Sequence, residues 1–214
     1  MIDHAAFSSS AYWEARYCAG GTSGAGSYGR LAAFKAAFIN AFIADNQIHD
    51  MLDLGCGDGS LLSLLDVPSY VGVDVSPTTL MRCANRFATR SNYVFLPPAQ
   101  LDEVTPVDLA VSIDVIFHLI EDAAFSRHID DLFGHARRFV LIYASNHDSA
   151  WSAPHVRHRR FSEPVAVHWP AWQLLAHVPN RFPYDPTQPD DTSFADFFVY
   201  GRTTEPCVIR VPGV

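Results

Sequence analysis

Residues 51–60 hold the pattern best suited to chemistry, because an apolar run there enters a turn with glycine at every second position, Met51-Leu52-Asp53-Leu54-Gly55-Cys56-Gly57-Asp58-Gly59-Ser60. Glycine lets the backbone bend sharply and lets a ligand lie directly against main-chain N–H groups. A helix is expected over residues 59–65, and its N-terminus would face the same space. The stretch predicts a nucleotide-binding turn.

Two further carboxylates stand where buried apolar runs end. Asp74 follows the run 69–73 and lies 19 residues after Gly55. A carboxylate at the tip of a second strand can accept both ribose hydroxyls of a nucleotide. Asp114 ends a later run in the same way. The dinucleotide-dehydrogenase spacing G-x-G-x-x-G would place its third glycine where this chain has Ser60, so the turn departs from that pattern.

Apolar periodicity predicts the elements that position these residues. Helices are expected at 8–17, 31–46, 59–65 and 77–88, with another ending near residue 132. Strands are expected around 51–54, 69–75, 92–96, 107–114 and 138–144. Strands that alternate with helices predict an α/β fold with a doubly wound, mostly parallel sheet. Two last strands, 172–178 and 194–200, have no helical pattern between them and should be antiparallel.

The segment 20–29 is rich in glycine and serine and lies between two predicted helices. Such a composition is typical of a flexible linker. A loop tethered between helices is also suited to folding over a bound ligand, and we favour this interpretation as a lid. Arg30, at the end of the segment, either pairs with a ligand carboxylate or simply begins the next helix at the surface.

Length and composition predict a single domain over residues 1–214, with N-terminal helices and lid in 1–47 and an α/β core in 48–202. The net charge of −8 argues against general affinity for nucleic acid or anionic membranes. No apolar run reaches the roughly 20 residues of a membrane span, and no signal-peptide pattern is present. Four cysteines without paired spacing predict reduced thiols in a cytoplasmic protein.

These motifs together resemble the class I S-adenosylmethionine-dependent methyltransferases. Asp53-x-Gly55-x-Gly57-x-Gly59 is similar to their first motif, Val73-Asp74-Val75 to their second-strand acid, and residues 113–119 to the segment after their fourth strand. The resemblance implies a seven-stranded sheet of order 3-2-1-4-5-7-6, with strand 7 antiparallel and helices on both faces. A narrower resemblance, to an uncharacterised group of small bacterial methyltransferases, is carried by residues 12–17, 20–30, 155–159 and 192–197.

The resemblance implies S-adenosyl-L-methionine as the cofactor, bound at the carboxyl ends of strands 1 and 2. The glycines would let the backbone approach its methionine part, Asp53 would take the ammonium, and Asp74 the ribose hydroxyls. Cys56 is interpreted as a small residue that fits the turn, with a reactive thiol as the alternative. The full set of implied cofactor contacts is Asp53, Gly55, Cys56, Gly57, Gly59, Asp74, Val75, Ala99, Gln100 and Arg30.

On the acceptor side, His118 is the candidate general base, and Asp114 is a candidate partner for the donor or for a substrate hydroxyl. The alternative interpretation of His118 is a packing residue at the start of the next helix. The basic segment 155–160 offers an anion site, assigned to His155, Arg157, His158 and Arg159, or is ordinary solvated charge. We therefore expect methyl transfer to a small, anionic acceptor of sugar-phosphate or nucleotide-sugar type, at oxygen, without metal or nucleic acid. The alternatives are a non-catalytic S-adenosylmethionine-binding or partner-binding module and a nicotinamide-dependent oxidoreductase.

Overall fold

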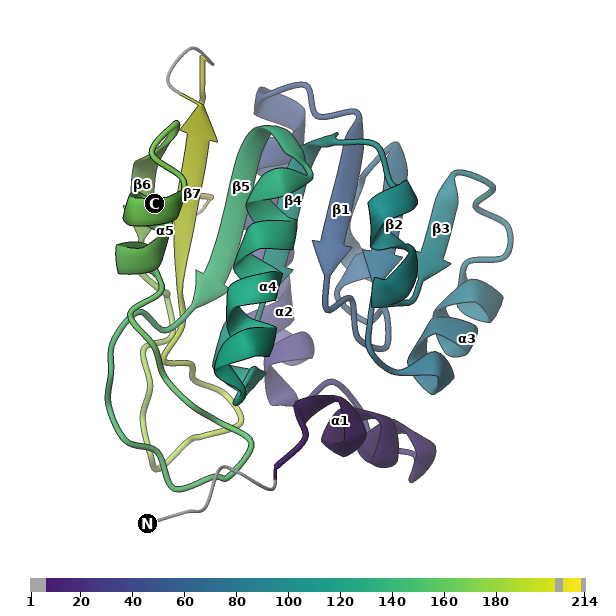
Figure 1. Ribbon diagram of the computed structural model, residues 1–214, viewed down its shortest axis with the longest axis vertical. Coiled ribbons are helices and arrows are strands. Elements are labelled where there is room, and N and C mark those ends of the chain that lie inside the picture. Colours follow the sequence, from purple (N-terminus) through teal and green to yellow (C-terminus); the bar gives the residue numbers. More distant parts are fainter. Residues whose placement is uncertain (1–6, 203–205, 213–214) are drawn as a thin grey trace.

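The computed structural model describes residues 7–202 and 206–212. One seven-stranded sheet of order β3-β2-β1-β4-β5-β7-β6 forms its centre (Figure 1). The strands are β1 (Asp50–Leu54), β2 (Ser69–Val73), β3 (Tyr93–Leu96), β4 (Val107–Ile113), β5 (Ala136–Ala144), β6 (Trp172–Val178) and β7 (Asp196–Arg202). β1 to β5 are parallel, and β7 runs antiparallel to both β5 and β6. The predicted fold class is confirmed.

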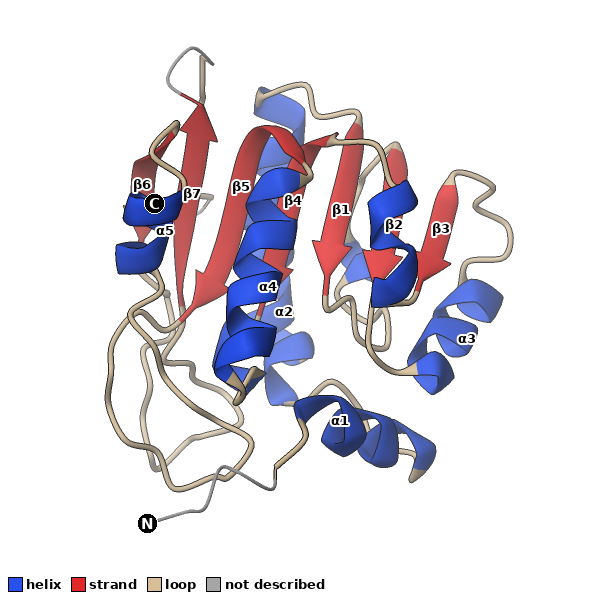
Figure 2. Ribbon diagram, in the orientation of Figure 1, coloured by secondary structure: helices blue, strands red, loops and turns tan. Residues whose placement is uncertain are grey.

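Helices cover both faces of the sheet (Figure 2). The α-helices are α1 (Ser9–Cys18), α2 (Gly29–Asp45), α3 (Pro77–Arg86), α4 (Asp122–Gly134) and α5 (Ser162–His168). α2 lies behind the sheet and α4 in front of it, while α1 crosses the edge at which the parallel strands end. None of the described helices has the length and apolarity that a bilayer crossing requires.

The central strands β4 and β5 are the most deeply buried part of the sheet. All seven residues of β4 and the last six of β5 are buried, so helices must cover both faces there. α2 supplies one cover through Phe38, Ile39 and Phe42. Because both strands end at the same edge, the polar residues that follow them meet there.

The structure differs from the predicted elements at several places. Residues 59–65 form a turn and a 3-10 helix, Leu62–Leu64, in place of the predicted α-helix. The glycine turn therefore has no α-helix N-terminus behind it. β7 begins two residues later than expected, at Asp196, and α5 lies in a region where no helix is predicted.

Candidate S-adenosylmethionine site

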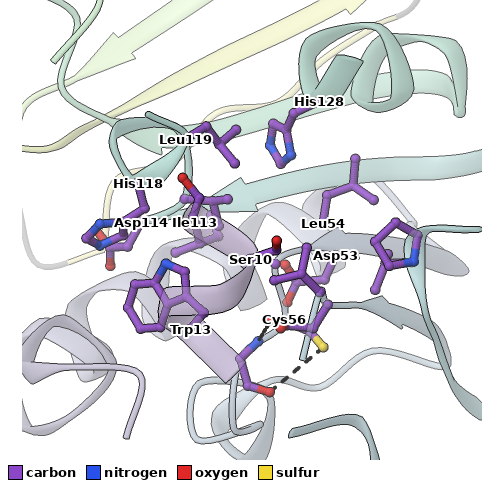
Figure 3. Close-up of a pocket in the computed structure, with 18 of the residues that line it drawn as sticks. Ser10, Trp13, Asp53, Leu54, Cys56, Ile113, Asp114, His118, Leu119 and His128 are labelled. Atoms are coloured by element: carbon purple, nitrogen blue, oxygen red, sulfur yellow. Dashed lines mark hydrogen bonds between the residues drawn. The ribbon is translucent and has the colours of Figure 1, made fainter. Parts of the chain in front are cut away.

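A cavity of about 280 Å³ lies at the carboxyl ends of the parallel strands. Its walls come from the glycine turn, the ends of β2 and β4, helices α1 and α4 and the 3-10 helix Pro98–Glu103 (Figure 3). Eight of the predicted cofactor and catalytic residues line the cavity: Asp53, Gly55, Cys56, Gly57, Asp74, Val75, Asp114 and His118. Chain segments more than 50 residues apart thus meet around one space.

The glycine turn contains two positions that only glycine can occupy without strain. Gly55 has φ of 93° and Gly57 has φ of 57°, a region that L side chains rarely adopt. Neither position has room for a side chain. A Cβ on Gly55 would overlap the side chain of Val115, and a Cβ on Gly57 would overlap Ser23 and lie 3.2 Å from the Tyr17 hydroxyl. Both glycines are therefore needed for conformation and for contact.

Asp74 is buried at the tip of β2 and turns toward the glycine turn. Its carboxylate accepts hydrogen bonds from the main-chain N–H of Gly57 (3.0 Å) and of Ser76 (2.9 Å). Burial nevertheless raises the pKa of Asp74 to about 6. Two oxygens with lone pairs left over line a cavity beside the glycines, which is the arrangement needed for two ribose hydroxyls.

Asp53 is the second buried carboxylate of this wall. It accepts a hydrogen bond from the Tyr70 hydroxyl at 2.9 Å. Burial raises the pKa of Asp53 to about 7, because desolvation outweighs the hydrogen bond from Tyr70. A cation in the cavity would favour the ionised form, which agrees with a role opposite an ammonium group.

The glycine- and serine-rich segment lies against the glycine turn. Ser23 and Asp58 exchange hydrogen bonds, from Ser23 N–H to the Asp58 carboxylate and from Asp58 N–H to the Ser23 hydroxyl, both at 2.9 Å. Tyr28 adds a hydroxyl bond of 2.7 Å to the same carboxylate. The segment occupies the position expected of a lid; its opening stays a prediction.

Helix α1 closes the cavity from the same side and is held at its first residue and near its middle. Ser9 donates its N–H (2.9 Å) and its hydroxyl (2.5 Å) to the Glu121 carboxylate just before α4. Glu14 accepts hydrogen bonds from Ser76 and from Thr78 (2.7 Å) at the start of α3. These bonds lower the pKa of Glu14 to about 2. Lid segment and α1 together form the roof of the cavity.

Lys35 is a residue that the sequence analysis does not identify. Its side chain, 1% exposed on α2, forms an ion pair with Asp114 and lies 5.1 Å from the centre of the Tyr143 ring. Asp114 has φ of 60°, an unusual value for a residue other than glycine. The signal was present in the sequence, since Lys35 shares the apolar face of its helix with Leu31 and Phe38.

His118 lies on the cavity wall beside Trp13, with ring centres 4.8 Å apart. Its Nδ1 is 2.8 Å from the main-chain carbonyl of His155, so Nδ1 carries the hydrogen and Nε2 keeps a free lone pair. Burial lowers the pKa of His118 to about 4, which keeps the ring neutral at pH 7. A neutral imidazole with its lone pair available is the form required of a general base.

Several predicted cofactor contacts lie outside the cavity. Gly59 packs against α3, where a Cβ would come within 2.8 Å of Phe87. Ala99 and Gln100 are exposed, because the 3-10 helix turns Pro98 and Leu101, three residues apart, toward the cavity instead. Arg30 does not line the cavity either.

Arg30 points outward from the first turn of α2. It donates to the main-chain carbonyl of Asp191 at 2.7 Å, and its guanidinium lies 4.6 Å from the centre of the Phe182 ring. The alternative expectation, a surface arginine at the start of a helix, describes it. A role toward a cofactor carboxylate has no support in this geometry.

The basic segment does not face the cavity either. Arg157 and Arg159 donate to main-chain carbonyls after β4, Arg157 to that of Ile120 at 2.9 Å, and both pair with Asp122. His158 is buried against Ser145, with Nδ1 2.6 Å from its hydroxyl. His155 stacks on Tyr12 at 4.8 Å and holds His118. Sequence alone could not foresee this, because the carbonyl acceptors lie about 37 residues away along the chain.

In the part of the chain that the structure describes, no group of three or more His, Cys, Asp or Glu side chains is arranged to hold a metal ion. The residues present fit S-adenosylmethionine. Asp74 offers carboxylate lone pairs beside the glycine turn, and Asp53 lies in the same wall. Pro98 and Leu101 provide an apolar surface for the adenine ring.

Comparison with known proteins supports this assignment. A family model described as a methyltransferase domain matches residues 52–140. A small RNA 2'-O-methyltransferase of Arabidopsis thaliana is 32% identical in an alignment of 155 positions that covers 63% of this chain and 16% of the plant protein. A putative methyltransferase of Mycobacterium tuberculosis is 35% identical in an alignment of 82 positions that covers 36% of this chain and 49% of that protein. The chain thus spans less than half the length of either curated relative.

Solved structures share the fold at low sequence identity. Magnesium protoporphyrin IX methyltransferase from Synechocystis, with bound S-adenosylmethionine, superposes with a TM-score of 0.64 at 15% identity, covering 93% of this chain and 99% of that one. The methyltransferase domain of bacterial CtHen1-CN gives 0.58 at 21% identity, covering 80% and 100%. N-methyltransferase NodS from Bradyrhizobium japonicum, in complex with S-adenosylhomocysteine, gives 0.61 at 14% identity, covering 81% and 87%.

The sheet order and the position of the cavity define a class I methyltransferase fold. Residues 52–140 match the family model described as a methyltransferase domain, and the chain shares its fold with solved S-adenosylmethionine-dependent methyltransferases.

Proposed function

We propose that this protein transfers a methyl group from S-adenosylmethionine to a small molecule, at oxygen. The observation that carries the proposal is Asp74, a buried carboxylate bonded to Gly57 N–H on the wall of a cavity at the strand ends. Asp74 would hold the ribose hydroxyls, Asp53 the ammonium, and the main chain of Gly55 and Gly57 the methionine part. Both the glycine conformation and the free carboxylate lone pairs support this.

S-adenosylmethionine supplies a methyl group already activated on a sulfonium, so the protein has mainly to align the acceptor oxygen and to exclude water. Alignment alone can account for several kcal/mol of a barrier. We assign to His118 the removal of the hydroxyl proton through Nε2, since its Nδ1 is fixed by the carbonyl of His155. Asp114, on the same wall and held by Lys35, would accept a hydrogen bond from the acceptor or the donor.

The acceptor is the least constrained part of the proposal. The expectation of an anionic acceptor depends on residues 155–160, and Arg157 and Arg159 already bind main-chain carbonyls and Asp122. These side chains give no reason to expect a phosphate or carboxylate. A nucleic-acid acceptor is favoured by the resemblance to a small RNA 2'-O-methyltransferase, whereas the net charge of −8 favours a small molecule, because RNA phosphates require cationic partners.

Calorimetric titration with S-adenosylhomocysteine tests the donor site, and a methyl-release assay with a library of small hydroxyl compounds tests turnover. We expect binding in the micromolar range that Asp74→Ala abolishes, and conversion of S-adenosylmethionine with one or more of the compounds. Binding with no turnover against small molecules or a small RNA duplex would favour the non-catalytic module. Stabilisation by NAD in preference to S-adenosylhomocysteine, measured by thermal shift, would favour the oxidoreductase and overturn the proposal.

A further inference from the structure

Aromatic rings form the wall of the cavity around the proposed base. Trp13 on α1 meets His118 edge-on, at 73° and 4.8 Å between ring centres, and is itself a lining residue. Behind this pair, His155 stacks on Tyr12 at 4.8 Å and on His118 at 5.5 Å. Figure 3 shows Trp13, His118 and Asp114 side by side on this part of the wall. A flat apolar ligand next to His118 would therefore meet the Trp13 ring.

Charge on the cavity wall is predominantly negative. Six carboxylate side chains line it: Asp53, Asp58, Asp74, Asp114, Glu121 and Asp131. Among the described lining residues, Arg127 is the one arginine or lysine, and it pairs with Asp131 of the same helix at 3.5 Å. Asp114 is partly neutralised from behind by Lys35, which does not line the cavity. The cavity therefore holds no unpaired arginine or lysine to bind an anion.

Glu121 extends the negative wall on the acceptor side. Ser9 N–H and hydroxyl donate to its carboxylate, and these bonds lower the pKa of Glu121 despite partial burial. Arg16 lies beside this aromatic wall, with its guanidinium 5.7 Å from the centre of the Trp13 ring, and its Nε donates to the main-chain carbonyl of Thr22 at 2.7 Å. A carboxylate or phosphate placed between Trp13 and Glu121 would meet like charge.

Resting on the function proposed above, we propose that the acceptor is a small aromatic hydroxyl compound that is uncharged or cationic. Its ring would pack against Trp13 with the hydroxyl toward His118, and a positively charged substituent would be tolerated by Asp114 and Glu121. A phosphate or carboxylate substituent would be rejected. This reverses the charge that the sequence predicts for the acceptor, because the structure takes the basic segment out of the cavity and brings acidic side chains into it.

The test uses three phenols whose para side chains are similar in length and end in groups of different charge: tyrosol (neutral hydroxyl), tyramine (cationic ammonium) and 4-hydroxyphenylacetate (anionic carboxylate). Each is titrated calorimetrically into the 214-residue protein saturated with S-adenosylhomocysteine. We expect tyrosol and tyramine to bind at least about tenfold more tightly than 4-hydroxyphenylacetate. Glu121→Gln should reduce the difference in affinity between tyramine and 4-hydroxyphenylacetate, because it removes one negative charge from the wall. The glutamine carbonyl still accepts a hydrogen bond from Ser9.

Trp13 provides the second arm. Trp13→Leu should weaken tyrosol binding by about tenfold or more, while Trp13→Phe, which keeps an aromatic ring, should stay within about threefold of the unmodified protein. Binding of S-adenosylhomocysteine by each variant shows that it is folded. Equal or tighter binding of the anion, an unchanged affinity in Trp13→Leu, or no binding of any phenol at millimolar concentration would each overturn the inference. Failure of S-adenosylhomocysteine itself to bind would instead refute the proposed function.

Discussion

Substituting alanine for Gly57 probes both demands that the glycine turn makes. Gly57 has φ of 57°, and an L side chain in this conformation costs roughly 1–2 kcal/mol. A Cβ there would also displace the Ser23 hydroxyl, which binds the Tyr17 hydroxyl and Asp58 N–H at 2.9 Å each. Two lost hydrogen bonds of about 1 kcal/mol each bring the total destabilisation to about 3–4 kcal/mol.

Gly29 offers a matched control, because its φ of 55° is nearly the same and a Cβ there would meet nothing within 4 Å. Gly29→Ala should therefore show the conformational cost alone. The difference of about 2 kcal/mol corresponds to a midpoint of thermal unfolding lower by about 4–8 °C in Gly57→Ala. We also expect Gly57→Ala, and not Gly29→Ala, to weaken S-adenosylhomocysteine by tenfold or more. Equal losses of stability in the two variants would refute the contact between the lid segment and the turn.

Three further predictions address the carboxylates, the base and the ion pair. Adenosine, which has no ammonium group, should bind with constant affinity above the Asp74 pKa of about 6. Below that pH its affinity should fall by up to about tenfold per pH unit, because the carboxylate that accepts the ribose hydroxyls becomes protonated. Calorimetry should show that Asp74→Asn binds adenosine weakly and without this pH dependence. His118→Ala should lower methyl transfer by roughly 10²–10⁴-fold while S-adenosylhomocysteine affinity changes less than threefold, and a fall in unfolding midpoint with no specific loss of turnover would assign His118 to packing. Asp114→Asn should lower the free energy of unfolding, measured in urea, by about 3–5 kcal/mol, because it leaves the buried Lys35 ammonium unpaired. The double variant Lys35→Met with Asp114→Asn should recover most of that loss. Additive effects of the two substitutions would contradict direct coupling between these side chains.

Strand ends were the part of the site that sequence could predict. Asp74 and Asp114 come directly after β2 and β4, Asp53 is the fourth residue of β1, and parallel strands bring such positions to one edge of a sheet. The glycine turn between them was identified for the same reason. The order of the strands followed from the family resemblance, since periodicity gives the elements and not their neighbours.

The sequence predicted the roles of residues outside the strand ends less accurately, and the physical reason differs from residue to residue. Ala99 and Gln100 were out of phase with a 3-10 helix that sequence periodicity did not reveal, and the lining positions are Pro98 and Leu101. The arginines of the basic segment were misassigned because their partners are main-chain carbonyls, which carry no sequence signal. Lys35 was overlooked among apolar neighbours, although a lysine on an apolar helix face is itself a signal of a buried partner.

The two tethers of α1 bear on the pace of a catalytic cycle. Opening the roof at the Ser9 end of α1 would break two hydrogen bonds to the Glu121 carboxylate. At a net cost of about 3 kcal/mol, the open form would make up about 0.6% of molecules. For the proposed enzyme, opening at Ser9 and Glu121 would then govern how often product leaves, and turnover would respond to changes at this hinge even though neither side chain takes part in the bond-making step.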